Sequence, residues 1–99
     1  MERLGVKTAA RVFRKLNNAT LWYLENRDGC FVETMLKNYQ EAVTALSYFP
    51  TIGRVVRKTT TREYRAYVAH KKCILVYWYN SKTLYITDII FTDTFKEGF

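Results

Sequence analysis

The hydrophobic pattern of this 99-residue chain changes its period once, at Pro50. Before Pro50, apolar residues recur at every third or fourth position, as they do along one face of a helix. After Pro50 they alternate or run without interruption, which is typical of strands. Because helical segments precede strands in this way, the pattern predicts an α+β fold in which a helical pair covers one face of a sheet.

Two helical stripes are predicted before Pro50. The first consists of Ala9, Val12, Phe13, Leu16, Thr20, Tyr23 and Leu24, and the second of Val32, Met35, Leu36, Tyr39, Val43 and Leu46. Between them, Asp28-Gly29 is expected to end the first helix, because glycine adopts the left-handed conformation of a helix end. Helices joined so closely form an antiparallel hairpin, and we expect both stripes to lie in the core. Leu21 and Trp22 either pack between the helices or contact a partner.

Strands are predicted on both sides of this hairpin. Residues 5–8 are expected to form an initial strand, and residues 64–69, 73–79 and 84–91 a three-stranded antiparallel meander. Residues 51–53, 70–72 and 80–82 are predicted to be turns, and residues 55–62 a polar, threonine-rich connection. The unbroken apolar run at 73–79 indicates a strand covered on both faces, which places Tyr77 and Trp78 in the core.

Length and composition limit the class of protein. Ninety-nine residues, 48% of them hydrophobic, suffice for one globular domain that spans residues 1–99. No apolar run approaches the ~20 residues of a membrane span, and the first residues lack the apolar core of a secretory signal. We therefore expect a cytoplasmic protein without membrane contact, in which Cys30 and Cys73 are reduced and mostly buried.

The net charge of +7 is concentrated in one segment. Residues 54–72 contain one acidic residue and seven basic ones, namely Arg54, Arg57, Lys58, Arg62, Arg65, Lys71 and Lys72. A dense positive strip attracts nucleic-acid phosphates through counterion release, and it attracts an acidic protein equally well. The alternative is a solvated surface that keeps a small protein soluble.

Few catalytic arrangements are compatible with this sequence. One histidine and two distant cysteines do not make a zinc site, and no phosphate-binding glycine motif is present, so we expect neither a metal nor a cofactor. A Cys73–His70 pair is a poor candidate, because buried thiols are inert.

What remains is metal-free chemistry on RNA phosphates, which needs a base, an acid and cations. The segment offers Arg54, Arg57, Arg62, Tyr64, Arg65, Tyr67 and His70 for this purpose. The same side chains also suit RNA binding without catalysis, because tyrosines among cations can stack on bases.

Several short motifs follow one another in a characteristic order. They are Leu46, Phe49-Pro50, Ile52-Gly53-Arg54, Tyr64-Arg65, Leu75-Val76-Tyr77 and residues 84–89. This ordered set resembles the RelE/ParE superfamily of bacterial toxins from type II toxin–antitoxin systems, over nearly the whole chain. The resemblance implies an antiparallel sheet curved around a basic concave face. It also implies a cognate antitoxin whose flexible, often acidic segment masks that face.

The resemblance implies two alternative targets. RelE-like members cut mRNA on the ribosome, whereas ParE-like members poison DNA gyrase and are not nucleases. Arg54 and Arg65 match recurring arginines of the family, so together with His70 they are the candidate catalytic residues. The candidates for binding nucleic acid or antitoxin are Arg57, Lys58, Arg62, Tyr64, Tyr67, Lys71 and Lys72.

The end of the chain departs from both branches of the family. Residues 91–99 contain none of the His, Tyr or Arg that the nucleases carry there, and the basic tail of the gyrase poisons is also missing. A degenerate module that binds nucleic acid or a partner without catalysis is therefore a third hypothesis. Arg54 and Arg65 have structural alternatives as well, in which Arg54 holds the turn after Gly53 and Arg65 forms an ion pair on the sheet.

Overall fold

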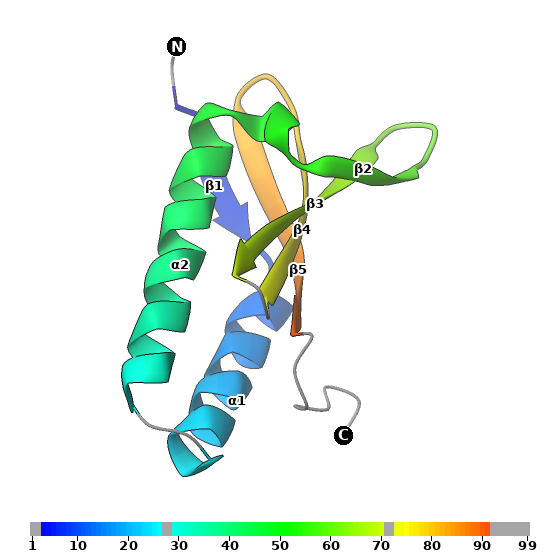
Figure 1. Ribbon diagram of the computed structural model, residues 1–99. Coiled ribbons are helices and arrows are strands. Elements are labelled where there is room, and N and C mark those ends of the chain that lie inside the picture. The colour runs from blue at the N-terminus through cyan, green and yellow to red at the C-terminus, as the bar shows by residue number, and fades with distance from the viewer. Residues whose placement is uncertain (1–2, 27–28, 71–72, 92–99) are drawn as a thin grey trace.

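The computed structural model describes residues 3–26, 29–70 and 73–91. Strand β1 (Gly5–Thr8) leads into two helices, α1 (Ala10–Asn26) and α2 (Gly29–Tyr48), and a 3-10 turn, η1 (Pro50–Ile52), follows. Four strands come next, β2 (Arg54–Lys58), β3 (Glu63–His70), β4 (Cys73–Tyr79) and β5 (Thr83–Phe91). Both helices lie on the same side of the sheet (Figure 1), so the predicted α+β layers are confirmed.

The strands form one sheet in the order β1-β5-β4-β3-β2. Strands β2 to β5 make an antiparallel meander, and β1 lies parallel to β5 at the far edge. The predicted initial strand and three-stranded meander are therefore confirmed, and the meander gains a fourth strand. The turn between β4 and β5 is held by the side chain of Asn80, whose Oδ1 accepts the amide hydrogens of Lys82 and Thr83.

The additional strand, β2, corrects the prediction of a polar connection over residues 55–62. Its five residues, Arg54–Lys58, are all exposed. A strand without a buried face shows no alternation of apolar and polar residues, which is the signal that sequence analysis uses. Basic residues on such an edge also discourage pairing with another chain. Only its pairing with β3 identifies this segment as a strand.

The buried seam of α1 is narrower than predicted. It consists of four residues, Val12, Leu16, Ala19 and Tyr23. Phe13 and Leu24, predicted for the same face, are 58% and 55% exposed. Successive steps of four, three and four residues define a single line along the helix, and among the described side chains of α1 only that line is buried.

Helix α2 keeps the predicted face, with Val32, Met35 and Leu46 buried. Helix α1 ends at Asn26, close to the predicted stop at Asp28-Gly29, but Gly29 is the first residue of α2 and does not adopt the left-handed conformation expected of it. At the edge of α1, Trp22 packs against the core and Leu21 is exposed. Of the helices in the described ranges, none combines the length and the hydropathy that a bilayer span requires.

Strand β4 is covered on one face only. Its buried residues, Cys73, Leu75 and Tyr77, alternate with half-buried ones, Ile74, Val76 and Trp78. The prediction that both faces are covered is wrong, because both helices lie on the same side of the sheet. The sheet therefore has a helix-covered face and an open face, and the strands that carry the basic residues contribute side chains to both.

Candidate functional site

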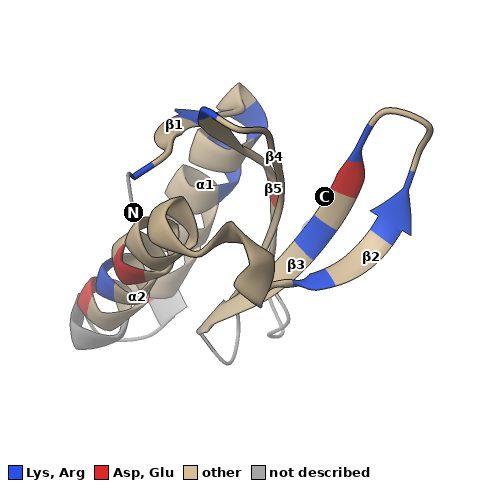
Figure 2. Cartoon of the chain, turned by 90° about the horizontal axis from the view of Figure 1, so that it is seen from above, with Lys and Arg blue, Asp and Glu red and all other residues tan. Residues whose placement is uncertain are grey.

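The basic residues of β2 and β3 are divided between the two faces of the sheet. Figure 2 shows them along both strands and at the ends of the connecting loop. Residues paired across neighbouring strands share a face. Arg65 pairs with the buried Tyr77, so it lies on the helix-covered face. Arg54 pairs with Ala66, and Ala66 pairs with Val76, so Arg54 lies on the open face, where it is exposed.

The open face carries a hollow of about 450 Å³, which we call the open-face hollow. Three exposed arginines line it, Arg57 from β2, Arg62 from the β2–β3 loop and Arg11 from α1. The other lining residues are Ala9, Val56, Tyr64, Val76, Thr87 and Asp88. Cations from two segments far apart in the sequence therefore meet at one concave surface.

Two β-bulges shape this hollow. In β2 the register against β3 skips one residue between Val55 and Arg57, and Val56 and Arg57 both line the hollow. In β5 the register skips Thr87, and Thr87 and Asp88 both line it. A bulge sets two consecutive residues opposite one residue of the neighbouring strand, so both can point to the same side. In a regular strand, one residue of each pair would face the helices.

The acidic member of the lining, Asp88, connects the hollow to α1. Its Oδ1 lies 2.8 Å from Nζ of Lys15 and also accepts the amide hydrogen of Ile89 at 2.8 Å. Neither Asp88 nor Arg11 was predicted from the sequence as a site residue. An isolated aspartate in a strand and an arginine on a helix give no signal until the fold brings them to one place.

Aromatic side chains lie beside the hollow. Trp78 and Tyr85 face each other across β4 and β5, with ring centroids 4.2 Å apart and planes inclined by 9°. The guanidinium carbon of Arg62 lies 4.4 Å from the centre of the Trp78 ring, and its Nη1 donates to the Tyr64 hydroxyl at 3.4 Å. Trp78, predicted for the core, is therefore half-buried and in contact with a cation of the open face.

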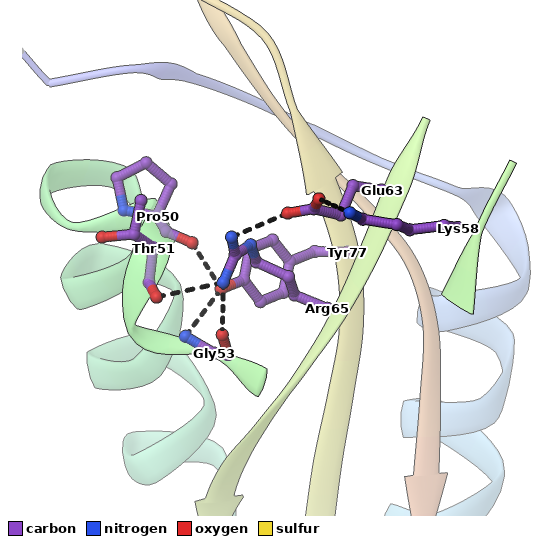
Figure 3. A network of polar contacts seen from close by, with 7 residues as sticks. All are labelled: Pro50, Thr51, Gly53, Lys58, Glu63, Arg65 and Tyr77. Atoms are coloured by element: carbon purple, nitrogen blue, oxygen red, sulfur yellow. Dashed lines mark hydrogen bonds and ion pairs between the residues drawn. The ribbon is translucent and has the colours of Figure 1, made fainter. Parts of the chain in front are cut away.

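On the helix-covered face, Arg65 is the centre of a different network (Figure 3). Its Nη1 donates to the carbonyl oxygens of Thr51 and Gly53, at 3.2 Å and 2.8 Å. Its Nη2 lies 2.7 Å from Oε1 of Glu63, whose Oε2 lies 3.5 Å from Nζ of Lys58. Only 17% of the Arg65 side chain is exposed. This guanidinium joins the η1 turn to the edge of the sheet.

The phenol of Tyr77 makes a second connection to the same turn. Its hydroxyl donates to the Pro50 carbonyl at 2.5 Å and accepts the Gly53 amide hydrogen at 3.0 Å. Burial raises the pKa of Tyr77 above its usual value, although the Gly53 hydrogen bond and the charge of Arg65 act in the opposite direction. The buried hydroxyl therefore remains protonated and keeps both bonds.

The remaining predicted site residues are separate from these groups. Tyr67 pairs with the buried Leu75, so it shares the helix-covered face and packs against the core. His70 is the last residue of β3, and its side chain is not among those described. Lys71, Lys72 and the tail after Phe91 lie outside the described residues.

The chemistry of Cys73 is that of a core residue. It is 1% exposed, and burial raises its pKa to about 12. Since the thiolate is the nucleophilic form, Cys73 is unsuited to covalent catalysis. Within the described ranges, no cluster of three or more His, Cys, Asp or Glu side chains could hold a metal ion.

Comparison with known proteins identifies the fold. No protein-family model matches this chain, and no curated protein matches it either. The solved structure of the YoeB dimer from Staphylococcus aureus is similar, with a TM-score of 0.62 and 17% sequence identity. The match covers 91% of this chain and 98% of that one. The RelE/ParE-like fold expected from the motif order is therefore confirmed.

Proposed function

We propose that this chain is the toxin of a bacterial type II toxin–antitoxin system. It acts in the cytoplasm on translation, by cutting ribosome-bound mRNA. A cognate antitoxin neutralises it. YoeB, whose fold it shares, is a type II toxin of the RelE superfamily. The observation that carries the proposal is the position of Arg11, Arg57 and Arg62 around a hollow on the open face of that fold. Three arginines on a concave surface suit the phosphates of an RNA strand.

The open-face hollow offers groups for both binding and cleavage. To Arg57 and Arg62, which line the hollow, we assign the neutralisation of the charge that builds up on a phosphate during attack by the 2′-hydroxyl. Arg54 lies on the same face and stays a candidate for this role. His70 stays a candidate acid or base. For Arg65 we propose the structural alternative, because its guanidinium is bonded to Thr51, Gly53 and Glu63 on the other face.

A partner protein is supported by a separate apolar region. Tyr48, Phe49 and Ile52 are 39%, 56% and 49% exposed around the η1 turn. Exposed apolar side chains just before the basic strand β2 in the sequence suit a segment that carries both acidic and apolar residues. We propose that this segment belongs to the antitoxin and that it covers the basic face while it is bound.

The test is controlled expression of the chain in bacteria, alone and together with the product of its neighbouring gene. We expect arrest of growth and of amino-acid incorporation, new 5′ ends in mRNA, and rescue by the neighbouring protein. The double substitution Arg57→Ala/Arg62→Ala should restore growth. A matched control is Lys37→Ala/Lys82→Ala, which removes the same charge from exposed positions outside the hollow.

Other outcomes distinguish the alternative functions. Loss of supercoiling and double-strand breaks with intact mRNA would indicate a gyrase poison. RNA binding without growth arrest or new mRNA ends would indicate a non-catalytic module. Equal rescue by the hollow variant and by the control variant would show that total charge, and not the hollow, is responsible.

A further inference from the structure

Arg62 lies at the junction of three hollows. It lines the open-face hollow and also a hollow of about 530 Å³ beside the β2–β3 loop. It lines a third, of about 300 Å³, next to β1 and β5. No other arginine within the described ranges lines all three. A ligand that enters any of these hollows therefore meets the same guanidinium.

An exposed arginine on a loop would ordinarily move among many rotamers. Fixing such a side chain in one place costs rotamer entropy, which a ligand would otherwise have to offset on binding. In this protein the neighbouring surface already restricts it, since its guanidinium carbon is 4.4 Å from the centre of the Trp78 ring. The two planar groups attract each other because the ring face is electron-rich.

Trp78 is itself held in place. It lies on β4, which is hydrogen-bonded to β3 on one side and β5 on the other. Its ring is stacked on Tyr85 at 4.2 Å, with the planes inclined by only 9°. Such a pair adds stability beyond the area that it buries. The sheet therefore holds the stacked rings of Trp78 and Tyr85, and the guanidinium of Arg62 lies over the Trp78 ring.

We propose that Trp78 is a positioning residue that holds Arg62 in place for the phosphodiester backbone of a single-stranded RNA. Arg57 and Arg11 supply further charge in the same hollow. The position of Arg62 follows from the contacts alone, whereas the choice of RNA as ligand rests on the proposed function. The planar fork of a guanidinium keeps its N–H edge available for a phosphate while its face rests on a ring.

The lining favours RNA over an acidic peptide. Asp88 contributes a carboxylate to the hollow, and a peptide carboxylate has no hydrogen to donate to it. An RNA strand instead brings 2′-hydroxyl and base amino groups that can donate to Asp88, next to phosphates that the arginines bind. Tyr64 adds a hydroxyl to the same lining.

The test is a double-mutant cycle on the binding of a fluorescent ten-nucleotide RNA, measured by anisotropy with the purified chain. We expect Arg62→Ala and Trp78→Leu each to weaken binding by about tenfold. The combination should be little weaker than either single variant, because both remove the same positioned group. Trp78→Phe keeps a ring and should retain most of the affinity, and Lys37→Ala should have no effect. Thermal unfolding of each variant checks that it is folded.

Several results would overturn the proposal. If the two effects multiply to about a hundredfold, Trp78 and Arg62 act independently. If Trp78→Leu binds as the parent does, or Trp78→Phe is as weak as Trp78→Leu, the ring does not position Arg62. Preference for a duplex DNA or an acidic peptide of equal length would show that the ligand is wrong. If the chain arrests growth but Trp78 and Arg62 are not coupled in RNA binding, only the positioning role of Trp78 is contradicted. If the two residues are coupled but the chain does not arrest growth, only the proposed function is contradicted.

Discussion

The hydroxyl of Tyr77 and the amide of Gly53 are joined by a buried hydrogen bond of 3.0 Å between residues 24 positions apart in the sequence. The same hydroxyl donates to Pro50, so one phenol from the central strand holds both ends of the η1 turn. Arg65 bonds to the carbonyl groups of Thr51 and Gly53 from the neighbouring strand. The start of β2, and with it Arg54, is therefore placed by two side chains of the sheet.

Gly53→Ala should destabilise the protein through direct overlap. A Cβ at this position would lie 2.8 Å and 2.9 Å from two ring carbons of Tyr77 and closer still to its hydroxyl. The ring is fully buried in the core, so it has little room to move. We expect a loss of about 1–3 kcal/mol in the free energy of unfolding, measured by urea denaturation. Gly5→Ala is the control, since its nearest neighbour would be a backbone oxygen at 3.7 Å. Equal effects of the two substitutions would contradict the overlap.

Tyr77→Phe should destabilise the protein without any overlap. It removes the hydroxyl that satisfies the Gly53 amide and the Pro50 carbonyl, and buried groups left without partners cost about 1–3 kcal/mol. Tyr64→Phe removes a hydroxyl whose bond to Arg62 is exposed, and it should cost less than about 0.5 kcal/mol. Urea denaturation of the two variants side by side measures the difference. Equal free energies of unfolding for the two variants would show that the hydrogen bonds of the Tyr77 hydroxyl do not stabilise the fold.

Arg65→Lys should lower stability and leave RNA affinity nearly unchanged. A lysine has no planar fork, so it cannot bond to Thr51, Gly53 and Glu63 together. The expected loss of unfolding free energy is about 1–3 kcal/mol, because Arg65 is largely buried. Denaturation and RNA binding are measured on the same preparation. A variant of unchanged stability that no longer arrests growth would instead support a catalytic role for Arg65.

Stability should fall in alkali because of Cys73. Burial raises its pKa from 9.0 to about 12, so the folded protein keeps a proton that the unfolded chain loses. The Cys73 thiol therefore leaves the free energy of unfolding unchanged below pH 9. Between pH 9 and pH 12 it lowers that free energy by about 1.4 kcal/mol per pH unit. The raised pKa of Tyr77 acts in the same direction above pH 10.

The measurement is the urea midpoint at several pH values from 7 to 11. Cys73→Val removes the thiol and keeps an apolar side chain of similar size, so its decline above pH 9 should be shallower than that of the parent. Parallel curves for the two proteins would show that Cys73 does not titrate in this range.

The helical hairpin, β4 and β5 were predictable because each buries several apolar residues, which leave a periodic pattern or an unbroken apolar run in the sequence. β1 and β3 contain no buried residue among those described, and their sequences show only a short or weakly alternating pattern. β2 was not predictable, since an edge strand with five exposed residues carries no such pattern. Within α1 the period indicated a helix but not the width of its buried seam. That width depends on how closely the partner surfaces approach.

For the candidate site, the sequence by itself determined the charge of residues 54–72 and the order of motifs that resembles RelE/ParE toxins. Only the tertiary structure decided which of these cations act together. Alternation along the strands sends Arg65 to the helices and Arg54 to the open face, and two bulges bring Arg57 and Asp88 into one hollow. The physical reason is that the face of a strand residue depends on register, and register is set by pairing with distant segments rather than by the residues themselves.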